Sequence, residues 1–258
     1  MSKPDKIVVF DLDETLGCFV ELGMFCDALS SYLKHQLSDN EFNEVLDIFP
    51  EFLRPNIINI LKYLMIQRNN GKCRKIMIYT NNQGPREWCE RISKYFDIKT
   101  GGKIFDKIIA AFKVKGEIIE IGRTSHNKSV SDLIRCANLP ENTEICFLDD
   151  QYHRLMEEEK VFYINVKPYI FNMPYNEMAS RYLKKGKLNV NSDEFINFIN
   201  THMSKYKFTV INKRSEDKDI DLIISKQIMI YLEEFFNKNG KNKTRRKRNG
   251  KNKTKRLR

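Results

Sequence analysis

The chain has 258 residues, of which 41% are hydrophobic and 31% are charged, and its formal net charge is +11 at pH 7. This length predicts one large domain or two small ones, with enough residues to bury a hydrophobic core. Eleven of the 45 Lys and Arg residues lie in the acid-free segment Lys241–Arg258, so 34 basic residues remain to balance the 34 acidic ones elsewhere. This excludes a basic face on the body of the protein as the source of the net charge.

No segment has the composition of a membrane span, because a span needs about 20 mostly apolar residues and runs such as Ile7–Phe10 are far shorter. The first residues lead directly into that run without the apolar core of a signal peptide. We therefore expect an intracellular protein, in the cytoplasm or the nucleus. The six cysteines are scattered without a Cys-x-x-Cys pair, which favours reduced core thiols over disulfides or zinc ligands.

Short β-branched runs alternate with helical patterns over the first two thirds of the chain. A flap with a short helix is predicted between Gly17 and Asn40. The other predicted elements are, in order, strand 6–10, helix 54–68, strand 75–79, helix 87–96, strand 105–112 with 118–121 as its candidate partner, helix 129–137, strand 144–148 and strand 161–166. This alternation predicts an α/β fold with a central parallel sheet.

Two further helices are predicted beyond Pro174, at 193–203 and 220–236. The second helix carries an apolar stripe that we interpret as packing on the sheet domain, with a partner-binding helix as the alternative. The stripe consists of Ile220, Ile223, Ile224, Ile228, Tyr231, Leu232 and Phe235. The predicted organisation is an α/β domain over 1–185, a helical extension packed on it over 186–238, and a tail over 239–258.

The tail contains two adjacent copies of a ten-residue basic repeat, 239–248 and 249–258, and its single apolar residue is Leu257. Such a composition predicts disorder. Three interpretations of Lys241–Arg258 stay open: a nonspecific tether to nucleic acid, a nuclear-import address, or a solvating end without a partner. The richness in Lys, Asn and Ile is typical of AT-rich genomes, such as those of some large DNA viruses.

Reactive side chains follow the carboxyl ends of three predicted strands. In open α/β sheets, ligands bind at that edge, so we expect these side chains to converge although they are far apart in the sequence. They are Asp11 and Asp13 after the first strand, Thr80 after the second, and Asp149 and Asp150 after the third of these strands.

Lys128 opens the helix that leads to the third of these strands, so its ammonium can reach the same edge. Clustered carboxylates raise one another's pKa unless a cation neutralises them. A hard divalent ion with oxygen ligands, in particular Mg²⁺, suits such a cluster. Catalysis of phosphoryl transfer consists mostly of positioning and charge stabilisation, so the set of groups suits that chemistry.

These residues resemble the motifs of a known superfamily. The segment Asp11-Leu-Asp-Glu-Thr15, directly after a predicted buried strand, resembles the first motif of the haloacid dehalogenase superfamily. The longer match, Asp-Leu-Asp-Glu-Thr-Leu, resembles this motif in the branch that contains the RNA polymerase II C-terminal-domain phosphatases. Arg54–Pro55 also resembles that branch, and Thr80, Lys128 and Asp149–Asp150 resemble the second, third and fourth motifs in the expected order. The resemblance covers roughly residues 5–185. It implies a Rossmannoid three-layer sandwich, and the short insert between the first two motifs implies a small flap and no large cap.

The resemblance also implies catalytic roles. Asp11 would be the nucleophile that forms an aspartyl-phosphate. Asp13 would protonate the leaving oxygen and then act as base on the hydrolytic water. Thr80 would hydrogen-bond a phosphate oxygen, with Asn81 as a further candidate, and Lys128 would offset negative charge.

The same resemblance implies a Mg²⁺ site. Its ligands would be the Asp11 carboxylate, the Asp13 backbone carbonyl and an acid of the last pair. Of that pair, Asp150 is favoured as the direct ligand and Asp149 as the outer residue.

The function expected from this set of motifs is that of a magnesium-dependent phosphatase acting on phosphoserine or phosphothreonine in a protein. Two segments beside the expected site, Gly17-Cys18-Phe19 and Gln151-Tyr152-His153, depart from the family pattern and leave the substrate open. One alternative is a nucleic-acid 3′-phosphatase tethered by the basic tail. Another is a catalytically idle module that binds protein or nucleic acid.

Overall fold

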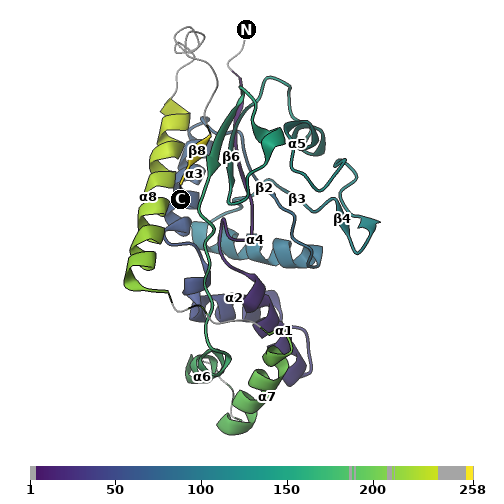
Figure 1. The fold of residues 1–258 in the computed structure, drawn as a ribbon, viewed down its shortest axis with the longest axis vertical. Helices are drawn as coiled ribbons and strands as arrows, with labels where there is room; N and C mark the ends of the chain where they lie inside the picture. Colours follow the sequence, from purple (N-terminus) through teal and green to yellow (C-terminus); the bar gives the residue numbers. More distant parts are fainter. Residues whose placement is uncertain are drawn as a thin grey trace.

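The computed structural model describes residues 4–185, 188, 190–207, 211, 213–237 and 254–257. Its centre is a sheet of six strands in the order β3-β2-β1-β6-β7-β8, and all five strand pairs are parallel (Figure 1). The strands are β1 (Lys6–Phe10), β2 (Lys75–Tyr79), β3 (Lys107–Ile109), β6 (Glu144–Asp149), β7 (Val161–Asn165) and β8 (Lys255–Arg256). The predicted α/β class with a parallel sheet is confirmed.

The strands are apolar because both faces of the sheet are covered. Ile7, Val8, Val9 and Phe10 of β1 are at most 1% exposed. Val8 and Phe10 belong to one core cluster, and Ile7 and Val9 belong to the other, as the two-residue period of a strand requires. A continuous β-branched run is therefore the sequence of a strand buried on both sides.

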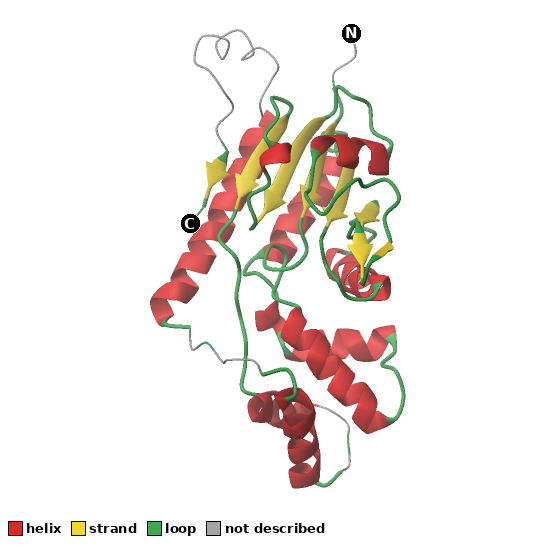
Figure 2. Ribbon diagram, turned by 45° about the vertical axis from the view of Figure 1, so that its right-hand side comes forward, coloured by secondary structure: helices red, strands yellow, loops and turns green. Residues whose placement is uncertain are grey.

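Helices cover both faces of the sheet (Figure 2). Helices α3 (Ile57–Asn69), α4 (Arg86–Thr100) and α8 (Ser215–Asn237) contribute to the larger core cluster, and α5 (Val130–Ala137) contributes to the smaller one. The α5 helix begins where the Ser129 side chain accepts a hydrogen bond from the Asp132 N–H at 3.2 Å, an N-cap that satisfies an end donor. Helix α4 ends at Gly101, whose φ of 83° is easily adopted only without a side chain.

The segment that follows β1 is larger than the predicted small flap with one short helix. The segment between β1 and β2 contains helices α1 (Val20–Leu33) and α2 (Asp39–Ile48) and the short 3₁₀ turn η1 (Pro50–Phe52) before α3. With α6 (Tyr175–Lys185) and α7 (Ser192–Ser204), they form a helical layer on the side to which the strand arrowheads point (Figure 2). Aromatic contacts join these distant segments, such as Tyr32 against Phe195 at 4.9 Å between ring centroids.

The predicted apolar stripe of α8 is buried in its later turns only. Ile224, Ile228 and Leu232 are at most 4% exposed, whereas Ile220 and Ile223 are 37% and 62% exposed. The first turns of α8 extend past the strands (Figure 1), so they have no sheet to cover. Within the described part of 186–238, α7 packs on α1 and α8 packs on the sheet.

The strand predicted over 105–112 is shorter than expected, and its candidate partner was wrong. β5 (Glu117–Ile118) pairs with β4 (Lys113–Val114) in an antiparallel hairpin and not with β3. Lys115 and Gly116 both have positive φ, 49° and 90°. Two such residues in succession form the tight turn that closes a two-residue hairpin.

The tail prediction lies mostly outside the described residues, which omit 238–253 and 258. Four tail residues, 254–257, are described, and Lys255–Arg256 forms β8 at the edge of the sheet. The prediction of disorder is therefore wrong for this part of the tail. All six cysteines are free thiols, as predicted. Within the described part of the chain, no helix combines the length and hydrophobicity needed to cross a bilayer.

Stability should depend on pH through Glu21 of α1. This side chain is buried, its Oε2 accepts the Met173 N–H at 3.2 Å, and its Oε1 has no partner among the described residues. Burial raises the pKa of Glu21 from 4.5 to about 7. Because the folded state then holds the proton more tightly than the unfolded state, this group should lower stability as the pH rises from about 4.5 to about 7.

Replacement of Glu21 by Gln removes that ionisation. Chemical denaturation should find Glu21→Gln more stable than the wild type at pH 8, by up to about 3 kcal/mol, and similar to it at pH 4.5. A difference that is the same at both pH values would show that Glu21 does not titrate in the folded state.

Candidate functional site

The sheet order brings the predicted site residues to one edge. β1 lies between β2 and β6, and all three strands are parallel, so the residues after Phe10, Tyr79 and Leu148 meet at their carboxyl ends. The Asp11 N–H donates to the Leu148 carbonyl at 2.8 Å, which extends the β1–β6 ladder to the first carboxylate. Backbone pairing therefore fixes where Asp11 lies relative to the acids that end β6.

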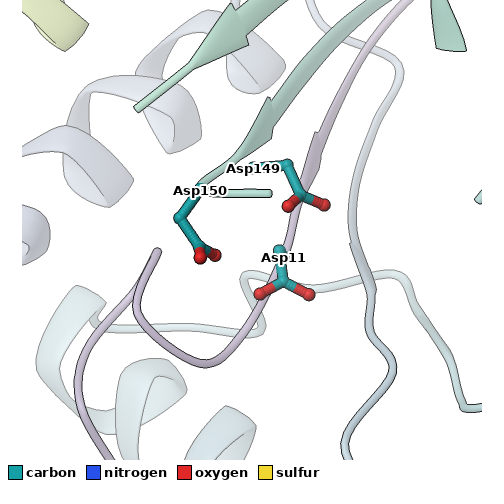
Figure 3. Close-up of side chains that lie close together, drawn as sticks. All are labelled: Asp11, Asp149 and Asp150. Atoms are coloured by element: carbon teal, nitrogen blue, oxygen red, sulfur yellow. The ribbon is translucent and has the colours of Figure 1, made fainter. Parts of the chain in front are cut away.

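Three of the predicted acids form one cluster. Asp11, Asp149 and Asp150 each offer a carboxylate oxygen within 4.8 Å of the others (Figure 3). Asp11 and Asp149 are buried, and Asp150 is partly exposed. Oxygen ligands in this number and spacing suit a hard divalent cation.

Lys128 joins this cluster from the residue before the α5 N-cap. Its Nζ donates to Asp11 Oδ1 at 2.5 Å and to Asp149 Oδ2 at 2.7 Å, and its side chain is 2% exposed. The ammonium also lies 5.7 Å from the centroid of the Tyr79 ring and 5.9 Å from that of Phe147. Buried ammonium groups need such partners, because an uncompensated buried charge is strongly unfavourable.

The charged groups of the cluster shift one another's pKa. Burial, opposed by Lys128 and reinforced by Asp149, raises the pKa of Asp11 to about 8. Burial would lower the pKa of Lys128, but Asp11 and Asp149 raise it overall. Burial would likewise raise the pKa of Asp149, yet Lys128 and His153 lower it overall. One ammonium does not neutralise three carboxylates, so the donor set fits a further cation of the Mg²⁺ type.

The two acids that end β6 differ in burial and in the charge of the groups that bind their oxygens. Asp149 Oδ2 accepts from Lys128 and lies 3.4 Å from His153 Nε2, while its Oδ1 accepts the Gln151 N–H at 2.8 Å. Asp150 is less buried, and both of its partners are neutral: its Oδ1 accepts from the Thr15 hydroxyl at 3.2 Å, and its Oδ2 accepts from the exposed Gln151 side-chain amide at 2.7 Å. This difference favours Asp150 over Asp149 as a direct metal ligand.

Asp13 lies outside the three-acid group but close to the loop after β2. Its Oδ2 accepts from the Asn82 side-chain amide at 2.6 Å, and its Oδ1 is buried without a partner among the described residues. Burial raises the pKa of Asp13, although Asn82 opposes the shift. Asp13 therefore keeps its proton to a higher pH than an ordinary aspartate does. Asn82 was not predicted from the sequence, although it directly follows the predicted Thr80 and Asn81.

Thr80 and Asn81 occupy the first positions after β2. The Thr80 N–H donates to the Ile109 carbonyl, and its Oγ1 accepts the Asn82 N–H at 3.0 Å. The Thr80 hydroxyl can therefore still donate its own hydrogen. The side-chain oxygen of Asn81 is buried and accepts no hydrogen bond from the described residues. Buried polar atoms are usually hydrogen-bonded, so this oxygen is a candidate contact for a bound group.

Arg54 holds the loop that carries Asp11 and Asp13, a role the sequence did not reveal. It is 1% exposed, and its guanidinium donates to the carbonyls of Thr15 at 2.6 Å, Glu14 at 2.6 Å and Lys167 at 2.9 Å. Glu14 adopts a φ of 59°, which is unfavourable for a residue with a side chain. Arg54 thus ties the strained turn after β1 to the segment after β7.

Arg123 likewise holds loops around the site by donating to backbone carbonyls. Its Nη1 donates to the carbonyls of Thr80 at 3.0 Å and Ala110 at 2.9 Å, and its Nη2 donates to the carbonyl of His126 at 2.9 Å. It therefore joins the ends of β2 and β3 to the loop that leads to Lys128. A single arginine in a polar loop gives no sequence signal for this role.

No family model matches this chain, and neither does any curated protein sequence. The superfamily resemblance therefore rests on the motif residues and their geometry.

Loss of Arg54 should destabilise the fold strongly. Arg54→Met removes a donor from three carbonyl groups, of which that of Glu14 still accepts the Tyr169 N–H, so urea denaturation should show a loss of about 3–5 kcal/mol. Arg54→Lys should recover less than half of this, because one ammonium lacks the planar fork that reaches all three carbonyls. The control is Arg74→Met, since Arg74 is 61% exposed and pairs only with Asp5 among the described acids. Its effect should stay within about 0.5 kcal/mol, and an equal effect of Arg54→Met would contradict the assigned role.

Mg²⁺ should stabilise the folded chain through the acidic cluster. Millimolar Mg²⁺ should raise the melting temperature of the wild type by roughly 5 °C, if the ion is present at about 100 times its Kd. Asp150→Asn should lose most of this shift. Glu141→Gln, which changes an 85% exposed acid, should keep it. Equal shifts in both variants would mean that the ion binds elsewhere.

Proposed function

We propose that this chain is a magnesium-dependent phosphatase of the haloacid dehalogenase type, in which Asp11 is transiently phosphorylated. The observation that carries the proposal is the buried contact of Lys128 with both Asp11 and Asp149 at the carboxyl end of the sheet. Support also comes from the order of the four motifs, which follow β1, follow β2, precede α5 and end β6. Helices on both faces of a parallel sheet agree with the expected three-layer sandwich.

Asp11 is the nucleophile in this proposal. Lys128 binds its Oδ1, which leaves Oδ2 to attack phosphorus as the bond from phosphorus to the leaving oxygen breaks. The product of this step is an aspartyl-phosphate on Asp11. A bound Mg²⁺, held by Asp11, Asp150 and the Asp13 carbonyl, would supply positive charge that keeps Asp11 ionised and offsets charge on the phosphoryl group.

Asp13 serves as acid and then as base. Its raised pKa lets it carry a proton to the leaving oxygen. The resulting carboxylate then takes a proton from water as the water oxygen attacks phosphorus, which releases inorganic phosphate and restores the Asp11 carboxylate. The bond from Asn82 to Asp13 Oδ2 orients the group and leaves Oδ1 for the transfer.

Thr80 and Asn81 would bind the non-bridging phosphate oxygens. The Thr80 hydroxyl retains a hydrogen to donate, and the Asn81 side chain supplies an amide beside it. Arg123 donates to the Thr80 carbonyl, so this contact supports the loop without using the Thr80 hydroxyl or the Asn81 side chain.

The proposed substrate class is phosphoserine or phosphothreonine in a protein, and it rests on the family resemblance alone. A site without a cap would favour a macromolecular substrate over a small metabolite, but the fold gives no such support. Helices α1, α2, α6 and α7 form a helical layer on the carboxyl side of the sheet.

Hydrolysis of p-nitrophenyl phosphate tests the proposed reaction. The wild type should turn over this substrate with Mg²⁺ and not with excess EDTA. Asp11→Asn should lower kcat by about 10³-fold or more, as loss of a covalent nucleophile does. Asp5→Asn is the matched control, because Asp5 precedes the strand that Asp11 follows and should leave the rate unchanged.

Activity that persists in Asp11→Asn would refute the proposed nucleophile. The same assay with a phosphoserine peptide and a 3′-phosphorylated oligonucleotide tests the substrate class. The proposal expects a higher kcat/KM for the peptide, and preference for the oligonucleotide would favour the nucleic-acid alternative.

A further inference from the structure

The second copy of the basic repeat supplies the outermost strand of the sheet. β8 pairs in parallel with β7, with Lys255 opposite Ile164 and Arg256 opposite Asn165. The Leu257 N–H then donates to the Asn165 carbonyl at 2.9 Å. Figure 2 shows this short strand at one edge of the sheet. The backbone of residues 254–257 therefore pairs with the edge of β7 in one defined register.

The side chain of Lys255 contacts an acidic and an aromatic residue of α8. Lys255 Nζ lies 3.7 Å from a Glu234 carboxylate oxygen and 5.3 Å from the centroid of the Tyr231 ring. Both partners belong to α8. An ammonium held between a carboxylate and an aromatic face is recognised by charge and by its position over the ring.

Two further side chains of the segment contact the loop that follows the acidic cluster. Thr254 Oγ1 donates to Glu157 Oε1 at 2.5 Å, and the Arg256 guanidinium lies 5.3 Å from the centroid of the Tyr152 ring. Leu257 packs against the larger core cluster. All four side chains of the segment therefore have a specific environment.

The two repeat copies differ at the position that packs. Both begin with Asn-Gly-Lys-Asn-Lys-Thr and end with Arg. Arg245 and Arg246 correspond to the cations Lys255 and Arg256, but Lys247 stands where the second copy has Leu257. The first copy carries six basic residues and the second carries five. If charge alone selected the docked copy, the first would have the advantage. The apolar contact of Leu257 distinguishes the copy that docks.

The docked segment also touches the loop beside the candidate active site. Tyr152, under Arg256, stacks on Tyr163 with ring centroids 6.1 Å apart. The Tyr163 hydroxyl donates to the Gln151 carbonyl at 2.7 Å and accepts the His153 N–H at 2.9 Å. The edge of β7 and the acidic cluster therefore share the loop that begins after Asp150.

We propose that the edge of β7, flanked by Glu157, Glu234, Tyr152 and Tyr231, is a docking site for an extended Thr-Lys-Arg-Leu segment. In this chain its own residues 254–257 occupy the site, and the same segment from a second copy of the chain can replace them. Only two residues pair with the sheet, and sixteen residues separate Asn237 from Thr254. The occupant is thus held mainly by its high effective concentration. The proposal does not depend on phosphatase activity.

The test compares full-length wild type with Leu257→Lys, which gives the second copy the residue of the first. The probe is a fluorescein-labelled peptide with the sequence of residues 249–258, followed by anisotropy at about physiological salt. Leu257→Lys should bind this peptide at least about tenfold more tightly than the wild type, because its own segment no longer competes. Lys247→Ala, in the first copy, should behave like the wild type.

The peptide of residues 239–248 is the matched control probe. It should bind Leu257→Lys about tenfold more weakly than the 249–258 peptide, although it carries one more basic residue. Equal or tighter binding of the 239–248 peptide would overturn the proposal in favour of nonspecific charge attraction. Failure of Leu257→Lys to gain peptide affinity would also overturn it.

Hydrogen exchange on the same two proteins gives an independent readout. The amide of residue 257 should be protected in the wild type, because it donates to the Asn165 carbonyl, and should lose its protection in Leu257→Lys. A Leu257→Lys protein that unfolds would show loss of protection throughout the sheet, including β1, and not only at this edge. An unprotected residue 257 in the wild type would contradict docking directly.

Discussion

The buried ammonium of Lys128 is the interaction on which the arrangement of the site depends. It is shared between Asp11, at the end of β1, and Asp149, at the end of β6, so a single charge joins two strands and the start of α5. Removal of either partner would leave a charge in a region with little access to water, and such a charge is strongly destabilising. The same contact limits the chemistry. Burial, which Lys128 offsets only in part, raises the pKa of Asp11. Lys128 also compensates only part of the negative charge of the cluster, which explains the fit of the donor set to a divalent cation.

The loops around this cluster are held by cations that bind backbone carbonyls. Arg54 secures the turn after β1, and Arg123 secures the ends of β2 and β3. Carbonyl oxygens carry no net charge, so the positive charge of these guanidinium groups is not cancelled by their partners. Burial lowers the pKa of Arg54 to about 10, which still leaves it charged at neutral pH. Each arginine therefore fixes loop geometry and contributes positive potential to a site proposed to bind phosphate.

The parts of the fold that depend on local patterns could be predicted from the sequence. The strands 6–10 and 75–79 were located correctly, because β-branched runs flanked by polar residues are read over a few residues. The convergence of Asp11, Asp149 and Asp150 followed from the parallel sheet alone. Features that depend on distant partners could not be predicted. The helical layer needs α1 to meet α7, and β8 needs the side chains of α8 and of the loop after β6. The exposure of Ile220 and Ile223 depends on where the sheet ends, which the period of the helix does not encode.

The most direct test of the central claim is chemical identification of the phosphorylated residue. An Asp13→Asn protein, which keeps the proposed nucleophile and lacks the proposed base, is mixed with p-nitrophenyl phosphate and Mg²⁺ and quenched in acid. Borohydride then reduces any aspartyl-phosphate to homoserine, and mass spectrometry of peptides locates it. The account predicts homoserine at position 11 and at no other aspartate. A phosphoryl group on a different residue, or an unmodified Asp11 in a preparation whose wild type hydrolyses the substrate, would contradict it.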